Sequence, residues 1–400
     1  MIFIKEHKNK IFLFVFVVFL ILFFVFSPKI FSEHYSVKNF ISNNVVPEET
    51  KEAEKIFVPS YVSTPVPVKG IYMTSWVAGT PSLRSKLVKI ADDTEINTVV
   101  IDIKDYSGKI VFPVDNPEFK AFGSEEIRVS DMRDFIESLH KKGIYVVGRI
   151  AVFQDAYFVK HRPDLAVKNK AGTAVWKDRK GISWIDPGSR EYWGYIKLVV
   201  IESRKIGFDE INFDYIRFPS DGDMTDISYP WSSTTPKAEV LKDFFAYLHD
   251  EFVVNHPLGE GDKRMKISAD LFGMVTTAKD DMGIGQLLEN ALPYFDYIMP
   301  MVYPSHYPPT FQGYKNPEAY PYEVVKYAMG EAVKRSELLA STTGQTVADL
   351  RPWLQDFGLK MTYGSSEVRA QIKATNDVGL DSWVLWSPSN KYTTNALIKE

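Results

Sequence analysis

Cysteine is absent from the 400-residue sequence, which excludes disulfide bonds, thiolate catalysis and cysteine-ligated zinc. An excess of basic residues is also lacking, because 47 Lys and Arg stand against 51 Asp and Glu and give a net charge of −4. No positive field for nucleic acid is therefore expected. No glycine-rich phosphate loop follows any predicted strand, which counts against a doubly wound α/β sheet.

A long apolar run lies near the N-terminus. It extends from Ile11 to Phe26 without a polar residue and follows Lys5, Lys8 and Lys10, an arrangement typical of an export signal or signal anchor whose N-terminus stays inside. The flanking sequence offers no small-x-small cleavage site, which favours an uncleaved membrane anchor with an extracytoplasmic barrel. The expected domains are a signal anchor or transmembrane helix (1–27), a flexible tether (28–66) and one globular domain (67–400).

From Gly70 onward, strand and helix signals alternate along the chain. Strands are expected at 70–76, 98–105, 145–153, 210–218, 266–273, 297–304, 351–358 and 382–388. Helices are expected between them, at 82–93, 131–143, 189–207, 237–253, 284–292, 321–339 and 366–379. Eight βα units over this length predict an α/β protein with a (β/α)8 TIM-barrel fold.

Asp214 stands near the end of the fourth predicted strand. Apolar residues alternate there with Asn212 and Asp214, and in a parallel barrel one parity faces the outer helices while the other faces the interior. The pattern predicts that Asp214 points inward near the C-terminal end of its strand, where barrel enzymes carry catalytic groups. A buried carboxylate is costly unless it is paired or used, so Asp214 is either catalytic or an ion-pair partner of Arg149 or Arg217.

Three other strands repeat this design. The positions expected to face the barrel interior hold Asp270 on the fifth strand, Arg149 on the third, and Asp102 and Lys104 on the second. A purely structural strand that is buried on both faces would more often read as continuous Val, Ile and Leu. Asp270 is therefore the second candidate catalytic carboxylate, and the other three, with Arg217, are candidate substrate-binding residues. A structural role is the alternative for Asp102 and Asp270.

Aromatic residues make up 14% of the sequence, which suits stacking on the flat faces of sugars, although most aromatic side chains serve cores. Trp386, at the end of the last predicted strand, is the preferred stacking residue. Tyr303 and His306 lie just beyond the sixth strand and could hydrogen-bond sugar hydroxyls, with ordinary loop roles as the alternative. The acidic loop at 221–226 does not match calcium-loop spacing, so neither a metal nor a cofactor is expected.

Ten runs along the chain resemble the motifs of one known family. They are GIYMTSWVAGTP, INTVVIDIKDYSG, GIYVVGRIAVFQD, RPDLAVKNKAG, WIDPGSREYW, GFDEINFDYIRFPSDG, ISADLFG, YIMPMVYPSHY, LRPWLQDFG and WVLWSPSN, and they cover about residues 67–396. In this order they resemble the bacterial family of glycoside-hydrolase-like TIM-barrel domains, which is related to α-amylase-type glycoside hydrolases. The resemblance implies a TIM barrel that acts on a glycan.

The resemblance also implies roles for particular carboxyl groups. In the α-amylase-type pattern the nucleophilic Asp ends the fourth strand, which matches Asp214, whereas the acid is a Glu after the fifth strand, where this chain has Asp270. A third carboxylate near the seventh strand is matched only loosely by Asp356. Cleavage of a glycosidic bond needs one carboxylate as nucleophile or base and one carboxylic acid to protonate the leaving oxygen.

Two functions from different classes fit the sequence. The first is a membrane-anchored glycosidase that hydrolyses a cell-envelope or extracellular polysaccharide. The second is a catalytically silent barrel that binds glycan or assembles with envelope proteins. The arrangement of Asp214 and Asp270 distinguishes them, because carboxyl groups about 5 to 10 Å apart across an open cleft suit catalysis. Arginines that cap both carboxylates in a closed barrel mouth would suit the silent barrel.

Overall fold

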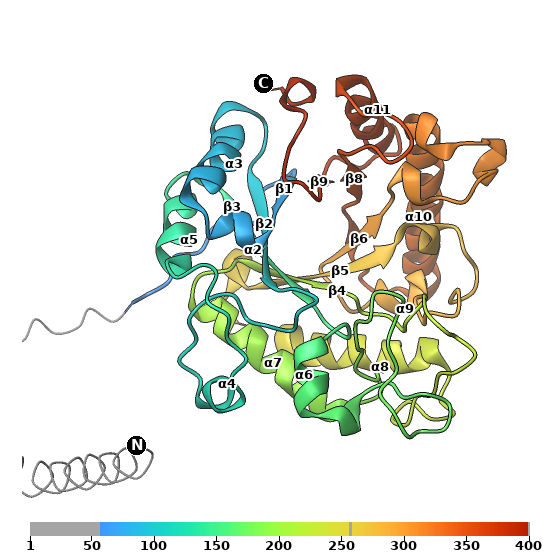
Figure 1. The fold of residues 1–400 in the computed structure, drawn as a ribbon. Coiled ribbons are helices and arrows are strands. Elements are labelled where there is room, and N and C mark those ends of the chain that lie inside the picture. The colour runs from blue at the N-terminus through green and yellow to red at the C-terminus, as the bar shows by residue number, and fades with distance from the viewer. Residues whose placement is uncertain (1–56, 256–257, 399–400) are drawn as a thin grey trace, which may run out of the picture. The chain divides into compact units, whose positions relative to one another are not determined.

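The computed structural model of the protein describes residues 57–255 and 258–398 (Figure 1). Nine strands form a single parallel sheet in the order β5-β4-β3-β2-β1-β9-β8-β6-β7, and β5 also pairs with β6, so that the sheet closes into a barrel. The strands are β1 (Lys69–Met73), β2 (Thr98–Lys104), β3 (Tyr145–Ala151), β4 (Glu210–Asp214), β5 (Lys266–Phe272), β6 (Tyr297–Met301), β7 (Asp349–Leu350), β8 (Trp353–Gln355) and β9 (Trp383–Trp386). The predicted (β/α)8 barrel is confirmed.

The seventh barrel position is filled by two short strands. Both β7 and β8 pair with β6, and they are separated by Arg351 and Pro352. Because proline has no N–H to donate to a sheet, it interrupts the ladder at this point. The Arg351 side chain turns into the barrel and forms an ion pair with Glu210 of β4, 3.1 Å apart and with both side chains fully buried. The barrel therefore has eight strand positions although the described residues form nine strands.

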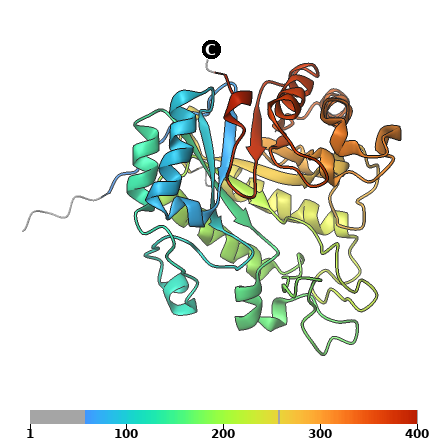
Figure 2. The ribbon, with the colours of Figure 1, turned by 45° about the horizontal axis from the view of Figure 1, so that its top comes forward.

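Helices surround the strands (Figures 1 and 2). They are α2 (Ser75–Ala78), α3 (Pro81–Asp93), α4 (Pro117–Phe122), α5 (Met132–His140), α6 (Ala156–His161), α7 (Arg190–Lys205), α8 (Lys237–His249), α9 (Leu288–Ala291), α10 (Pro321–Thr343) and α11 (Ser365–Asn376). The helix expected at 284–292 is reduced to the single turn α9, and α10 extends beyond its expected end at 339 to Gly344, a left-handed cap. Gly344 has φ +67°, a conformation that ends helices readily because glycine has no Cβ.

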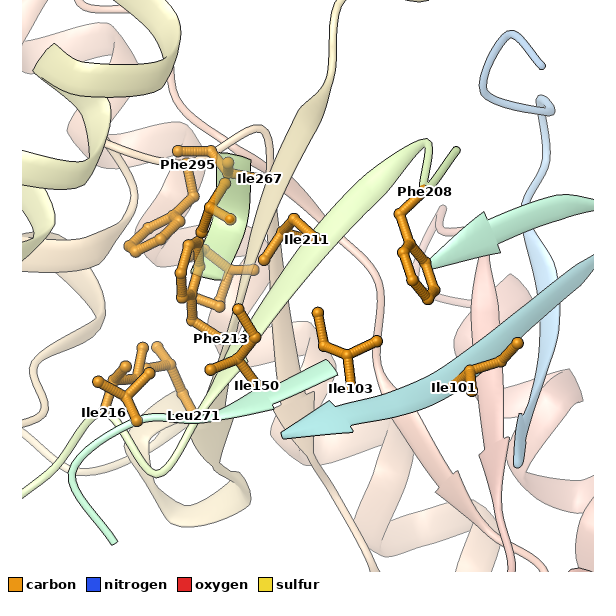
Figure 3. Close-up of a cluster of buried hydrophobic side chains, with 14 of the residues drawn as sticks. Ile101, Ile103, Ile150, Phe208, Ile211, Phe213, Ile216, Ile267, Leu271 and Phe295 are labelled. Atoms are coloured by element: carbon orange, nitrogen blue, oxygen red, sulfur yellow. The ribbon is translucent and has the colours of Figure 1, made fainter. Parts of the chain in front are cut away.

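The predicted alternation of inward and outward residues is present in the strands. Outward residues such as Ile103, Ile150 and Phe213 join one large apolar cluster between the barrel and the helices (Figure 3). A separate, smaller cluster fills the interior and contains Tyr72, Val100, Tyr145, Val147, Met299, Tyr303, Trp353 and Val384. The interior also holds charged residues, including Asp102, Arg149, Asp214 and Asp270, which are all buried.

Residues 58–66, which the sequence assigns to the tether, contact the N-terminal ends of the strands. The N–H of Val62 donates to Oδ1 of Asp209, just before β4, at 2.8 Å, and the hydroxyl of Tyr61 donates to the carbonyl of Arg204 at 2.9 Å. The Arg204 guanidinium lies over the Tyr61 ring, 3.3 Å from its centroid. These contacts explain why the compact unit that contains the barrel begins at Val58.

The expected membrane anchor at 11–26 lies outside the described residues. Within 57–255 and 258–398, no helix combines the length and the apolar character needed to cross a membrane.

Candidate active site

A cavity of about 350 Å³ opens at the C-terminal ends of the barrel strands. Its lining includes seven residues that are predicted from the sequence to belong to the site: Arg149, Asp214, Arg217, Asp270, Tyr303, His306 and Trp386. It is also lined by Tyr215, Phe272, Gly273, Met274, Met301, Tyr307 and Trp353. The cavity therefore has apolar and aromatic walls with a few charged groups, as is typical of small-molecule sites.

Asp214 ends β4 with its carboxylate bound on both oxygens. Oδ2 accepts hydrogen bonds from Arg149, from Nε at 3.2 Å and from Nη2, and Oδ1 accepts from the N–H of Tyr215 at 2.6 Å. Tyr215 adopts a left-handed backbone conformation with φ 54°, which is uncommon for a residue other than glycine and costs on the order of 1 kcal/mol or more. The hydrogen bond from the Tyr215 N–H holds Oδ1 of Asp214 at this turn.

Asp270 lies on β5 in a different environment. Its Oδ1 accepts two hydrogen bonds from neutral donors, the amide of Asn212 at 2.8 Å and the indole N–H of Trp353 at 2.7 Å. No hydrogen bond reaches Oδ2 from any residue that the structure describes, and the nearest cation to that oxygen is Nε of Arg149, 3.9 Å away. Burial, and next the charge of Asp214, raise the pKa of Asp270 well above its ordinary value, against the lowering effects of Arg149 and the two donors. Asp270 therefore favours the protonated form, with Oδ2 free to carry the proton.

Arg149 limits how far apart the two carboxyl groups can lie. Its Nε is 3.2 Å from Oδ2 of Asp214 and 3.9 Å from Oδ2 of Asp270. The two Oδ2 atoms therefore cannot lie further apart than the sum of these distances, about 7 Å. The catalytic carboxyl groups of glycosidases are separated by ~5–10 Å. This upper limit overlaps the range of separations that glycosidases use.

Asp102 is the third carboxylate around Arg149, but it does not line the cavity. Its Oδ1 pairs with Nη1 of Arg149 at 2.6 Å, and its Oδ2 accepts a hydrogen bond from the hydroxyl of Tyr72. Burial raises the pKa of Asp102, although Arg149 and Tyr72 lower it. Burial by itself would lower the pKa of Arg149, but the charges of Asp214 and Asp102 raise this pKa well above its ordinary value. Asp102 therefore holds Arg149 in place rather than facing a ligand.

Lys104, predicted to point inward, lies outside the cavity. The pairing of β2 with β3 shifts register between Asp102 and Lys104, so the simple alternation of faces fails there. The fully buried Lys104 ammonium instead pairs with Asp155 at 2.8 Å and donates to the carbonyl of Ala151 at 2.6 Å. This closed ion pair beside α7 does not fit a substrate-binding role.

Four further sequence candidates, Arg217, Tyr303, His306 and Trp386, also line the cavity. Trp386 stacks on Tyr72 with ring centroids 4.0 Å apart, which fixes the indole plane. Tyr303 is buried and packs edge-on against His306, with ring centroids 5.4 Å apart. Burial, followed by the charges of Asp270 and Asp214, raises the pKa of the Tyr303 hydroxyl, so this group remains a hydrogen-bond donor. His306 is exposed and lies at the rim.

Asp356, the loose match to a third catalytic carboxylate, has a structural role. It accepts hydrogen bonds from the N–H of Thr393 at 2.8 Å and from its hydroxyl at 2.6 Å, and it is not part of the cavity lining. It therefore ties the C-terminal segment to the seventh strand position. Within the described parts of the chain, no group of three or more His, Asp or Glu residues is arranged to hold a metal ion.

Three residues that orient the candidate groups are absent from the sequence-based candidates. Asn212 and Trp353 orient Asp270, and Tyr72 supports both Asp102 and Trp386. Asn212 shares the inward parity of Asp214, so the alternation that identified Asp214 could have identified it as well. Trp353 could not be placed in this way, because the interruption at Pro352 obscures the alternation of the seventh position.

The fold and the site together define a TIM-barrel protein with the carboxylate-lined cavity typical of glycoside hydrolases. Residues 70–392 match the model of the family described as "Putative glycosyl hydrolase domain". The chain belongs to this family, as its motifs indicated. A search of curated proteins gives no match.

Solved structures with a similar fold include glycoside hydrolases. The PgaB (BpsB) glycoside hydrolase domain from Bordetella bronchiseptica is 15% identical with a TM-score of 0.60, and the match covers 84% of this chain and 100% of that one. Alpha-L-fucosidase isoenzyme 2 from Paenibacillus thiaminolyticus is 13% identical with a TM-score of 0.53, over 82% of this chain and 47% of that one. A hypothetical protein from Ruminiclostridium thermocellum ATCC 27405 is 29% identical with a TM-score of 0.44, over 54% of this chain and 98% of that one.

Proposed function

We propose that the protein is a glycoside hydrolase in which Asp270 is the acid and Asp214 is the nucleophile or base. The observation that carries the proposal is the contrast between the two carboxyl groups. Asp214 is ion-paired with Arg149, whereas Asp270 receives neutral donors on one oxygen and has its pKa raised by burial and by Asp214. One charged and one protonated carboxyl group facing the same cavity are the pair that glycosidic cleavage requires.

In the proposed reaction, the proton on Oδ2 of Asp270 moves to the glycosidic oxygen as the bond between that oxygen and the anomeric carbon breaks. The Asp214 carboxylate stabilises the positive charge that develops on the anomeric carbon, and it either bonds to this carbon or takes a proton from the attacking water. In the first case the Asp270 carboxylate then takes a proton from the water that hydrolyses the glycosyl ester. In the second, Asp214 releases the proton that it took from water to solvent and Asp270 recovers a proton from solvent, so that both groups return to their starting states.

The proposed substrate is a cell-envelope or extracellular polysaccharide. Support for this location comes from the uninterrupted apolar run at 11–26 and the lysines before it, which are typical of a signal anchor with the following domain outside. On this proposal, protease added to intact cells should reach the barrel. A barrel that is protected until the cells are lysed would reverse the topology.

The central test is a hydrolysis screen of the protein against diverse glycans, with new reducing ends as the measured product. The matched variant Asp214→Asn preserves the shape of the side chain and removes its charge. Release of reducing ends by the parent but not by the variant supports the proposal. Equal release by both would show that Asp214 does not take part in the chemistry.

The silent glycan-binding or envelope-assembly barrel is the second candidate, and one observation favours it. Arg149 pairs with both Asp214 and Asp102, as in a structural ion cluster. The two candidates differ in what Asp214→Asn does: a structural cluster loses stability when one partner is neutralised, whereas a catalytic carboxylate loses turnover while the fold persists.

A further inference from the structure

Arg217 is a buried cation in the wall of the cavity. It lies three residues after Asp214 and is 8% exposed. Three aromatic rings surround its guanidinium, whose Cζ lies 4.8 Å from the ring centroid of Trp184, 4.7 Å from that of Phe272 and 5.4 Å from that of Tyr215. These rings fix the guanidinium plane and keep water away from its faces.

The hydrogen bonds of Arg217 use only one of its three nitrogens. Nη1 donates to the carbonyl of Phe218 at 3.0 Å and to the hydroxyl of Ser220 at 3.1 Å. Among the residues that the structure describes, neither Nε nor Nη2 makes a hydrogen bond, and no carboxylate forms an ion pair with Arg217. Nε–H and Nη2–H point the same way along one edge of the guanidinium, and this edge binds carboxylate oxygens two at a time.

Arg217 differs in this respect from the other buried arginines of the described residues. Arg149 pairs with Asp214 and Asp102, and Arg351 pairs with Glu210. Arg204 has no ion pair within the described chain either, but its Nη1 and Nη2 both donate to backbone carbonyls, those of Phe208 and Lys263. Burial lowers the pKa of Arg217, and the opposing effects of Tyr215 and Asp214 do not restore it. A buried charge without a partner is costly. The donor edge of Arg217 therefore indicates an anionic partner that the described chain does not supply.

We propose that Arg217 binds an oxyanion of the substrate, so that the cavity selects a negatively charged sugar. The group is a uronic acid carboxylate, or a sulfate or phosphate ester in the same position. This inference rests on the proposed function and names the class of glycan. Because Asp214 and Asp270 line the same cavity, the charged sugar occupies a subsite next to the bond that is cleaved.

The charge balance of the cavity fits this class of substrate. Arg149 is shared by Asp214 and Asp102, so a further carboxylate in the cavity would meet net negative charge if no other cation were present. Arg217 supplies that cation. The protonated form of Asp270, which its surroundings favour, lowers the repulsion further.

The test compares sugars that differ only in charge. D-glucuronate and D-glucose form one pair, D-galacturonate and D-galactose a second, and glucose 6-sulfate and glucose 6-phosphate provide the ester arm. Binding to the full chain is measured by calorimetry or ligand-observed NMR, which need no turnover. A charged sugar should bind about tenfold or more tightly than its neutral counterpart. A preference for the esters over the uronates would identify the ester as the oxyanion.

Variants then assign the preference to Arg217. Arg217→Met should lower the affinity for the charged sugar to that of its neutral counterpart and leave the neutral sugar unchanged, whereas Arg217→Lys should keep part of the preference. Arg179→Met, which removes an exposed arginine outside the cavity lining, is the matched control and should have no effect.

Three results would overturn the inference. The first is equal affinity of the parent for charged and neutral sugars, and the second is no detectable binding of any charged sugar. The third is an equal loss of affinity for the charged and the neutral sugar in Arg217→Met, which would mean that Arg217 only supports the fold. Hydrolysis of a neutral glycan without any preference for charge would also contradict it, while leaving the proposed hydrolase function intact.

Discussion

Trp353 donates its indole N–H to Oδ1 of Asp270 over 2.7 Å. The donor comes from the seventh barrel position and the acceptor from the fifth, so the bond crosses the interior of the barrel. Since Asn212 donates to the same oxygen, the two bonds leave Oδ2 as the proton-bearing oxygen. The proposed acid is thus oriented by neutral groups that cannot take its proton away.

Trp353→Phe tests this orientation. The indole N–H lowers the pKa of Asp270, so its removal should raise that pKa further. The alkaline limb of the pH–activity profile should therefore move to higher pH, with a loss of stability of about 1 kcal/mol for the lost hydrogen bond. Trp383→Phe removes an equal volume from the outer cluster and should leave the profile in place. A shift toward lower pH would contradict the assignment of Asp270 as the acid.

Asp214→Asn should abolish turnover and largely preserve the fold. Removal of a nucleophile or base typically lowers kcat by a factor on the order of 10⁴ or more. Circular dichroism and thermal unfolding check the fold, and Asp134→Asn, at an exposed position of α5, controls for the loss of one negative charge. If the variant unfolds and the parent never shows activity, Asp214 is a structural ion-pair member.

Asp270→Asn should affect different substrates to different degrees. A glycoside with an alkyl or sugar leaving group needs a proton on the departing oxygen, whereas an activated phenol leaves with little acid assistance. The variant should therefore lose activity by roughly 10²-fold or more on the first kind and much less on the second. Equal losses on both kinds would argue that Asp270 does not act as the acid.

Asp270→Asn should also change how the stability of the protein depends on pH. Because the pKa of Asp270 is raised in the folded protein, the stability that its protonated form contributes is present below the ordinary value of 3.8 and is lost as pH rises through the folded pKa. The Asn side chain of Asp270→Asn cannot ionise, so the variant does not lose this stability. The melting temperature of the variant minus that of the parent should therefore increase as pH rises from 3.8 through the folded pKa of Asp270. The measurement is a pH series of thermal unfolding. A constant difference at all pH values would show that Asp270 does not titrate above its ordinary range.

The start of the folded unit can be tested by truncation. A fragment that begins at Val58 retains the contacts of Tyr61 and Val62 with Arg204 and Asp209, whereas one that begins at Pro67 loses them. The shorter fragment should be less stable by on the order of 2 kcal/mol, measured by denaturant unfolding. Tyr61→Ala in the longer fragment should reproduce part of the loss. Equal stability of both fragments would support the boundary expected at 67.

Alternation along single strands predicted much of the site. It placed Arg149, Asp214 and Asp270 on the inner face, because a regular strand turns successive side chains to opposite sides. The eight strand positions followed from the same signal, together with the helices between them.

The remaining features depend on interactions between strands that are distant in the sequence. The register shift that turns Lys104 away from the cavity arises in the pairing of β2 with β3. The hydrogen bond from Trp353 to Asp270 requires knowledge of which strands face each other across the barrel. Packing of the closed barrel, and not spacing along the chain, decides which carboxylates Arg149 binds. It also leaves Arg217 without an ion-pair partner among the described residues.

The contacts of residues 58–66 also matter for handling the molecule. They hold the incoming chain against the starts of the strands, at Asp209 and Tyr145, whereas the cavity lies where the strands end. A support, label or fusion partner joined ahead of Val58 is therefore attached at the opposite end of the barrel from the mouth. Immobilisation through the N-terminus should leave the cavity open to a long polymer, and a sensor surface prepared in this way would present it outward.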